Sequence, residues 1–141
     1  MIKLETLGMY ENSHVNPVLT SQSAVKNYSF ITVAGVPYLV ANDLSGDNAY
    51  VDDVTFAAGE YLNGWDLTKW VNQKLVIDEG HITYGSGESY ASITAGTTLL
   101  KAKSDGTLEI TSEAPSSGVY FKVTDKVTLN GKAVKAMIMV A

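Results

Sequence analysis

The sequence predicts a mainly β protein, a small barrel or sandwich, with one short helix near residues 66–74 and an extended N-terminal arm. Eight tyrosines, twelve glycines and many valine, threonine and isoleucine residues favour strands and turns over helices. Short apolar runs follow one another with glycine turns between them, which is typical of small barrels and sandwiches. The length of 141 residues suits one domain. We therefore expect an arm over residues 1–27 and a single β-rich domain over residues 28–141.

The arm differs in pattern from the rest of the chain. Its polar stretch follows neither the strand nor the helix period, and Asn16-Pro17 disfavours a helix. Isolated apolar residues can anchor such an arm to a surface; they are Leu7, Met9, Tyr10, Val15 and Leu19. Two interpretations are equally open. The arm either ties neighbouring subunits together by strand addition or by apolar side chains in grooves, or it covers a sheet edge of its own chain.

The domain opens with a hairpin. Tyr28–Val33 alternates in polarity, Ala34-Gly35 allows a turn, and Val36–Ala41 forms the return strand. Pro37 has no N–H and belongs at a strand start or a sheet edge. We expect a further strand over residues 50–56.

The helix is expected from Asp66 to Lys74. Asp66 can serve as its N-cap, because its carboxylate can accept hydrogen bonds from the first turn. The residues of its buried face have the three-and-four spacing of a helix; they are Leu67, Trp70, Val71 and Leu75. A helix this short is marginal alone, so it must be stabilised by docking on the sheet.

The rest of the chain reads as strands joined by tight turns. Ser104-Asp105-Gly106 and Asn130-Gly131 are hairpin turn signals, since glycine adopts the left-handed conformation that such turns need. The runs expected as strands are residues 74–78, 97–103, 107–111, 119–124, 127–129, 132–134 and a last strand over 134–140.

Composition argues against several classes of function. The net charge is -5 and all ten basic residues are lysine. Without arginine or a basic patch, nucleic-acid binding is disfavoured. There is no cysteine for disulfides or thiolate sites. The N-terminus lacks the pattern of a signal peptide, and the apolar tail over residues 133–141 is too short to span a bilayer, so we expect no membrane partner and synthesis in the cytoplasm.

A search for chemistry finds no convincing site. His14 and His81 lack the spacing of metal ligands and are best interpreted as exposed or hydrogen-bonded structural residues. An acidic loop offers oxygen ligands for calcium, but it does not follow the EF-hand pattern, and a solvated turn is the preferred interpretation. The acidic residues of that loop are Asp43, Asp47, Asp52 and Asp53.

Carboxylates beside tryptophans suggest a carbohydrate site as an alternative. Trp65 and Trp70 lie among four acidic residues, and paired carboxylates can hydrolyse glycosides. These acidic residues are Glu60, Asp66, Asp78 and Glu79. The preferred interpretation is that Asp66 caps the helix while both tryptophans pack in the core. The glycine-containing stretches match neither a nucleotide loop nor a nucleophile elbow. We therefore expect no catalytic residue, no cofactor and no metal, and thus not an enzyme.

Several stretches of the chain resemble the head decoration, or cement, proteins of tailed bacteriophages. The resemblance spreads over the whole chain rather than residing in one motif. Its stretches are Met1–Met9, Asn27–Phe30, Phe56–Leu67, Ala95–Ala102, Asp105–Leu108 and Ala133–Val140. The chain departs from the smallest of these proteins by its longer arm and by the expected helix from Trp65 to Trp70.

The resemblance implies a non-enzymatic virion structural protein on the capsid exterior, made in the host cytoplasm. Such a protein binds outside the shell and stabilises it by bridging neighbouring subunits. Its implied partners are the major capsid protein and further copies of itself in a homo-oligomer. The residues expected to contact them are Leu4, Leu7, Met9, Tyr10, Val15 and Leu19. The alternatives are another phage virion component, of the tail or neck, or a carbohydrate-binding module built on Trp65 and Trp70.

Overall fold

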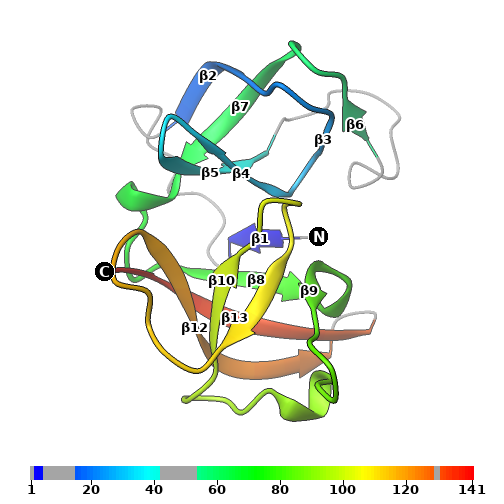
Figure 1. The fold of residues 1–141 in the computed structure, drawn as a ribbon, viewed down its shortest axis with the longest axis vertical. Coiled ribbons are helices and arrows are strands. Elements are labelled where there is room, and N and C mark those ends of the chain that lie inside the picture. The colour runs from blue at the N-terminus through cyan, green and yellow to red at the C-terminus, as the bar shows by residue number, and fades with distance from the viewer. Residues whose placement is uncertain (1, 5–14, 42–53, 129–130) are drawn as a thin grey trace.

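The computed structural model describes residues 2–4, 15–41, 54–128 and 131–141, which form two lobes along the long axis of the molecule (Figure 1). The large lobe is a seven-stranded sheet; the small lobe holds a four-stranded sheet and a two-stranded ribbon. Strands make up 50% of the chain and helical turns 8%, and the sheets curl into half-barrels. The mainly β class that the sequence predicts is therefore confirmed.

The large lobe is organised around the long β12–β13 hairpin. Its sheet has the order β1-β8-β13-β12-β10-β11-β9, so β1 and β9 are the edge strands among those that the structure describes. Along β13, Val134, Ala136 and Ile138 are buried on the inner face. The alternate residues Lys135 and Met137 are half-buried on the outer face, which is the period of two expected of a strand with one packed face. The strands are Ile2–Leu4 (β1), Lys74–Asp78 (β8), Ile82–Thr83 (β9), Leu99–Ala102 (β10), Leu108–Thr111 (β11), Val119–Thr128 (β12) and Lys132–Val140 (β13).

The small lobe is thinner. Its sheet has the order β2-β7-β5-β4, and the ribbon pairs β3 with β6. Its buried apolar cluster has four residues, Leu19, Val25, Val40 and Leu62. Its strands are Val15–Thr20 (β2), Val25–Lys26 (β3), Phe30–Val33 (β4), Val36–Val40 (β5), Thr55–Phe56 (β6) and Tyr61–Asp66 (β7).

One hydrophobic core joins the two lobes. Phe30 and Leu39 of the small lobe are buried in the same cluster as Leu100, Phe121 and Ile138 of the large lobe. The ring centroids of Phe30 and Phe121 are 5.1 Å apart. Because the small lobe contributes Phe30 and Leu39 to the core of the large lobe, one core spans both lobes, beside the smaller four-residue cluster of the small lobe.

The expected helix from Asp66 to Lys74 is wrong. The structure has a single 3-10 turn, η3, at Leu67–Lys69, and β8 begins at Lys74. Asp66 caps this turn as expected, and Leu67 is buried, but Val71 is 38% exposed. The turn ends at Lys69 with Trp70 as its C-cap. Asn72, with a left-handed φ of 69°, cannot continue a helix, and the following residues gain more by pairing with β13. Two more 3-10 turns, η4 (Glu79–His81) and η5 (Tyr90–Ser92), precede and follow β9.

The hairpins that the sequence predicts are confirmed. Ala34 and Gly35 both have positive φ, 50° and 78°, as a two-residue turn between β4 and β5 requires. β10 and β11 flank the turn at Gly106, whose φ is +84°. β12 pairs with β13 up to Thr128, which lies opposite Lys132; residues 129–130, where a turn is expected, lie outside the described residues. The sequence pattern missed β7, the strand at the centre of the small lobe.

Two strands of the N-terminal segment lie at sheet edges. β1 pairs antiparallel with β8 in the large lobe, and β2 pairs antiparallel with β7 in the small lobe. Residues 5–14, between them, lie outside the described residues. The division of the chain at residue 27 stays a prediction.

Candidate interaction surface

The six residues expected to contact a partner fall in different places. Leu4 and Val15 are in the edge strands β1 and β2, whereas Leu7, Met9 and Tyr10 lie outside the described residues. Leu19 is 4% exposed and belongs to the buried cluster of the small lobe. We therefore assign the Leu19 side chain to the core of its own chain. Those of the other residues remain expected contacts, and the described residues do not bring them together into one site. The interpretation of the arm as a cover for its own sheet edge fits the pairing of β1 and β2.

The two tryptophans are part of the junction between the lobes. Trp70 is 7% exposed, and the ring centroids of Trp65 and Trp70 are 5.5 Å apart with their planes at 53°. The Trp65 indole N–H donates a hydrogen bond to the carbonyl oxygen of Ala41 at 3.4 Å. Both side chains pack with the core, whereas a sugar-binding platform needs an open ring face.

Two of the carboxylates beside the tryptophans hold turns. Asp66 Oδ1 accepts hydrogen bonds from the backbone N–H of Thr68 at 3.0 Å and from its hydroxyl at 2.6 Å. Glu60 Oε2 accepts one from the backbone N–H of Ala57 at 2.6 Å. These bonds satisfy donors that a turn leaves unpaired, so the sequence alternative of a carboxylate pair for glycoside hydrolysis gains no support from either residue.

The remaining candidates for chemistry are two tyrosines, the two histidines and the acidic loop. Burial, and next the Glu79 carboxylate, raise the pKa of Tyr84 to about 12, and the same two causes raise the pKa of Tyr90. Both phenols are therefore neutral at ordinary pH. In the described part of the chain, no group of three or more histidine, aspartate or glutamate side chains is arranged to hold a metal ion. His81 lies in η4, while His14 and the acidic loop lie outside the described residues.

Lys126 links the β12–β13 hairpin to the segment that contains η5. Its Nζ donates hydrogen bonds to the carbonyl oxygens of Tyr90 at 2.9 Å and Ile93 at 3.0 Å, and it lies 4.3 Å from the centroid of the Tyr90 ring. The Tyr90 hydroxyl donates a hydrogen bond to the carbonyl oxygen of Ala133 at 2.7 Å, and Lys132 Nζ lies 5.5 Å from the same ring centroid. Together these contacts fix the 3-10 turn η5 against the β12–β13 hairpin.

The clearest candidate for contact with a partner is one face of the β4–β5 hairpin, which we name the hairpin face. Its four apolar side chains, Ile31, Val33, Val36 and Tyr38, are half-buried and come from strand positions that point to the same side of the sheet. Three of them pack on the four-residue cluster of the small lobe. The ribbon of β3 and β6 adds Val25 and Phe56 to that cluster, and the hairpin face remains partly open to solvent.

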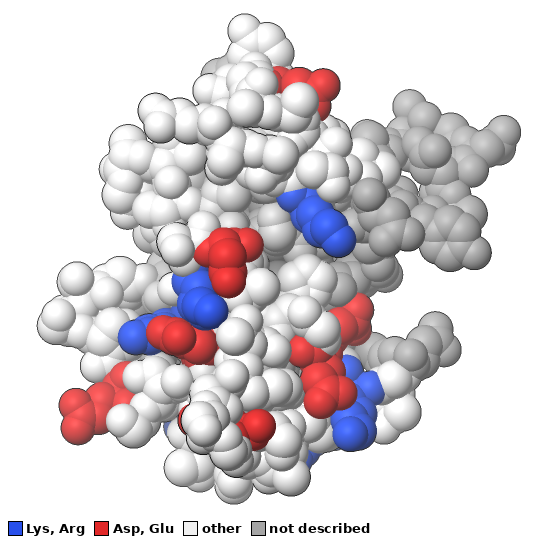
Figure 2. Space-filling model, turned by 45° about the vertical axis from the view of Figure 1, so that its right-hand side comes forward, with Lys and Arg blue, Asp and Glu red and all other residues white. Residues whose placement is uncertain are grey.

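Among the residues that the structure describes, charge is sparse in the small lobe that carries the hairpin face. The described residues of the small lobe carry three charged side chains, those of Lys26, Glu60 and Asp66. Figure 2 shows most acidic and basic side chains on the large lobe and a mostly uncharged surface above it. An apolar surface with few charges is typical of a region that another protein covers.

Gly64 allows the packing beneath the hairpin face. A Cβ at this position would overlap Leu19 Cδ2 and would lie 3.0 Å from Tyr38 Cδ1. The absence of a side chain on β7 therefore lets Leu19 and Tyr38 lie directly over its backbone. This close approach explains a glycine within a strand, where it is otherwise unfavourable.

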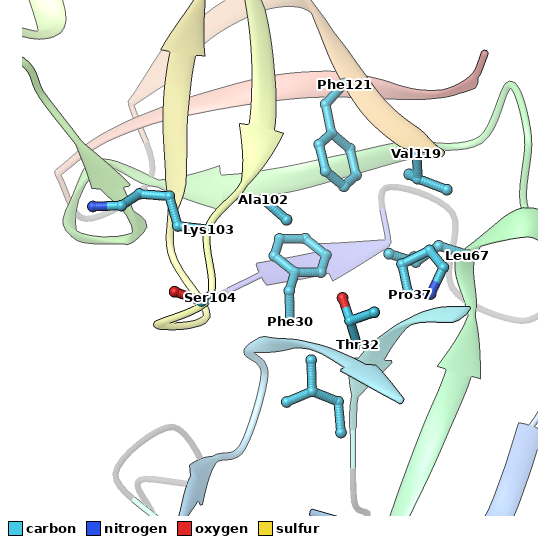
Figure 3. A pocket seen from close by; sticks show the side chains of 10 residues that line it. Phe30, Thr32, Pro37, Leu67, Ala102, Lys103, Ser104, Val119 and Phe121 are labelled. Atoms are coloured by element: carbon cyan, nitrogen blue, oxygen red, sulfur yellow. The ribbon is translucent and has the colours of Figure 1, made fainter. Parts of the chain in front are cut away.

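A groove of about 360 Å³ lies on the other side of β4, between the two lobes (Figure 3). Phe30, Leu67 and Phe121 are among its apolar residues, and the end of β10 forms its other wall. We name it the β4 groove. The residues that line it are Phe30, Ile31, Thr32, Pro37, Leu67, Ala102, Lys103, Ser104, Val119 and Phe121.

The β10–β11 turn holds one end of this groove in place. The Phe30 N–H donates a long hydrogen bond, 3.5 Å, to the carbonyl oxygen of Gly106. Asp105 Oδ1 accepts hydrogen bonds from the backbone N–H of Thr107 at 2.9 Å and from its hydroxyl at 2.6 Å. These hydrogen bonds are the main cause of the lowered pKa of Asp105, and they keep the turn in its docked shape.

Compared with protein families, with curated proteins and with solved structures, the chain shows no match. None of the described helical turns is long and apolar enough to cross a membrane.

Sequence reasoning identified the β4–β5 hairpin but missed its value as a surface. The signal was available, because no charged residue occurs from Asn27 to Asn42. Such a run is consistent with either a buried hairpin or a contact surface. The half-buried state of its side chains, which only the fold determines, distinguishes the two.

Proposed function

We propose that this chain is a non-enzymatic virion structural protein, which binds the outside of a tailed-phage capsid and bridges neighbouring subunits of the major capsid protein. The observation that carries the proposal is the uncharged, half-buried hairpin face on a lobe with three described charged residues. The resemblance of several stretches of the chain to head decoration proteins supports the choice of partner.

The physical basis is the removal of apolar surface from water. Burial contributes about 25 cal/mol per Å² of apolar surface, and a protein that binds only the closed shell raises the free energy needed to open it. The edge strands β1 and β2 belong to different sheets. The segment between them holds Leu7, Met9 and Tyr10, which we propose as further contacts. A second contact on the same chain strengthens the first through high local concentration.

The direct test is binding to the capsid of the phage that encodes the chain. We expect the purified protein to sediment with capsids and to raise their melting temperature. Val36→Asp places a charge on the hairpin face where the side chain is half-buried, and we expect it to weaken binding by about tenfold or more. Ser112→Asp, at an exposed position of the large lobe, is the matched control and should bind normally.

Two results would contradict the proposal. One is that the protein has no affinity for capsids and is missing from virions. The other is that Val36→Asp and Ser112→Asp bind equally well although both are folded by circular dichroism. Electron microscopy of labelled particles separates the head from the tail and neck, because a tail component would appear in rings or tubes instead of over the shell.

A further inference from the structure

Among the strands that the structure describes, β4 is a short edge strand that carries neither a charged residue nor a proline against pairing. It is the last strand in the order β2-β7-β5-β4. Edge strands in natural proteins commonly carry lysine, proline or a bulge that prevents another strand from adding. The sequence of β4, Phe30 to Val33, contains no charged residue and no proline, and its pairing with β5 has no register shift.

The hydrogen-bond register aims backbone groups of β4 away from β5. Val40 N–H donates to the carbonyl oxygen of Ser29 at 2.9 Å, and hydrogen-bonded and non-hydrogen-bonded pairs alternate along an antiparallel ladder. Thr32, which lies opposite Pro37, is therefore in a non-hydrogen-bonded pair, in agreement with the missing N–H of proline. Hence the N–H and C=O of Thr32 point to the open side of β4.

The lobes already use this side of β4 at one place. The Phe30 N–H, two residues before Thr32, donates to the carbonyl oxygen of Gly106. Beyond that contact the lobes separate and form the β4 groove, which Thr32 lines. Figure 3 shows Phe30 pointing toward Phe121, with Thr32 beside its pairing partner Pro37. The volume of the β4 groove, about 360 Å³, is within the range of about 300–1,000 Å³ that is usual for ligand sites.

The chemistry of the groove specifies its occupant. A backbone donor and acceptor aimed sideways from a strand are matched by another extended polypeptide. The half-buried apolar residues Pro37 and Val119 suit a branched apolar side chain. Among the described residues that line the groove, Lys103 carries the one charge. Its ion pair with the exposed Asp105, at 3.5 Å, is partly open to solvent and contributes little, so an acidic side chain on the occupant complements Lys103.

We propose that the β4 groove binds an extended segment of a partner protein, which adds to β4 as a strand and carries an acidic residue beside a branched apolar residue. The segment pairs with the backbone of Thr32, packs its apolar side chain against the half-buried Pro37 and Val119, and places its carboxylate near Lys103. This proposal goes beyond capsid binding and does not rest on it.

The test uses nuclear magnetic resonance of the labelled full chain with three synthetic hexapeptides. Each alternates valine with threonine and carries aspartate, lysine or proline at one shared position. We expect the aspartate peptide to slow hydrogen exchange of the Thr32 amide by about tenfold or more at saturation. The lysine peptide should bind about threefold more weakly, as for an exposed ion pair, and the proline peptide should give no protection.

Charge reversal supplies the second readout. Lys103→Glu should bind the lysine peptide better than the aspartate peptide, whereas Lys122→Glu, at an exposed position on the outer face of the large lobe, should keep the original order. The proposal is overturned if no peptide changes the exchange of Thr32, or if Lys103→Glu leaves the order unchanged. It is also overturned if Thr32 becomes protected as protein concentration rises without peptide, since the occupant is then a second copy.

Discussion

Replacing Gly64 by alanine tests whether the small lobe depends on close packing over β7. The new Cβ would overlap Leu19 Cδ2 and lie 3.0 Å from Tyr38 Cδ1 and 3.2 Å from Tyr38 Cγ. Leu19 is 4% exposed, so its methyl group cannot move into solvent without disturbing the four-residue cluster. Overpacking of this kind costs about 1–3 kcal/mol.

Alanine also has an opposing effect on the unfolded chain. It reduces the conformational freedom lost on folding, which stabilises by about 0.4–1 kcal/mol where the backbone conformation is compatible. The net expectation for Gly64→Ala is a loss of about 1–2 kcal/mol in the free energy of unfolding. For a chain of this size, the melting temperature should fall by about 3–8 °C.

The assay is urea denaturation followed by tryptophan fluorescence, with thermal melts by circular dichroism. Gly80→Ala is the matched control, because a Cβ there meets nothing within 4 Å, and it should be neutral or slightly stabilising. If Gly64→Ala is as stable as the unmodified chain, the packing of Leu19 and Tyr38 over β7 is refuted as a determinant of the small lobe.

Two further predictions concern the large lobe. Because the pKa of Tyr84 is raised from 10.0 to about 12, the folded state should lose stability as pH rises from about 10 to 12. Tyr84→Phe should flatten this part of the curve of unfolding free energy against pH, and ultraviolet titration of tyrosinate checks the pKa. Equal curves for the two proteins would contradict the raised pKa. Lys126→Met removes hydrogen bonds to the carbonyls of Tyr90 and Ile93 and should cost about 1–3 kcal/mol in urea denaturation. Lys122→Met, at an exposed site, should cost almost nothing; equal losses would contradict the assigned role of Lys126.

The helix from Asp66 to Lys74 shows where local pattern is misleading. Its cap at Asp66 and its buried residues Leu67 and Trp70 are real, yet only one turn forms. The spacing of Leu67, Trp70 and Leu75 fits a helix, but Leu75 belongs to the strand β8 and is buried there. Short segments have little intrinsic helical stability, so pairing of β8 with β13 decided the outcome.

The candidate site was less accessible to sequence reasoning than the fold. The absence of charge from Asn27 to Asn42 is visible in the sequence, but the same run could have been buried on both faces. The register that turns the Thr32 backbone outward depends on its pairing partner, Pro37. The groove depends on the β10–β11 turn, which is distant in sequence.

The sequence by itself determined the β class, the absence of cysteine and arginine chemistry, and the turns at Ala34-Gly35 and at Gly106. These features follow from local rules, because strand alternation and the left-handed freedom of glycine act over a few residues. Only the tertiary structure decided that the lobes share one core, that β4 is an edge, and that the hairpin face stays half-open. These features depend on long-range contacts, since burial and edge position are properties of the neighbours that a strand finds and not of its own residues.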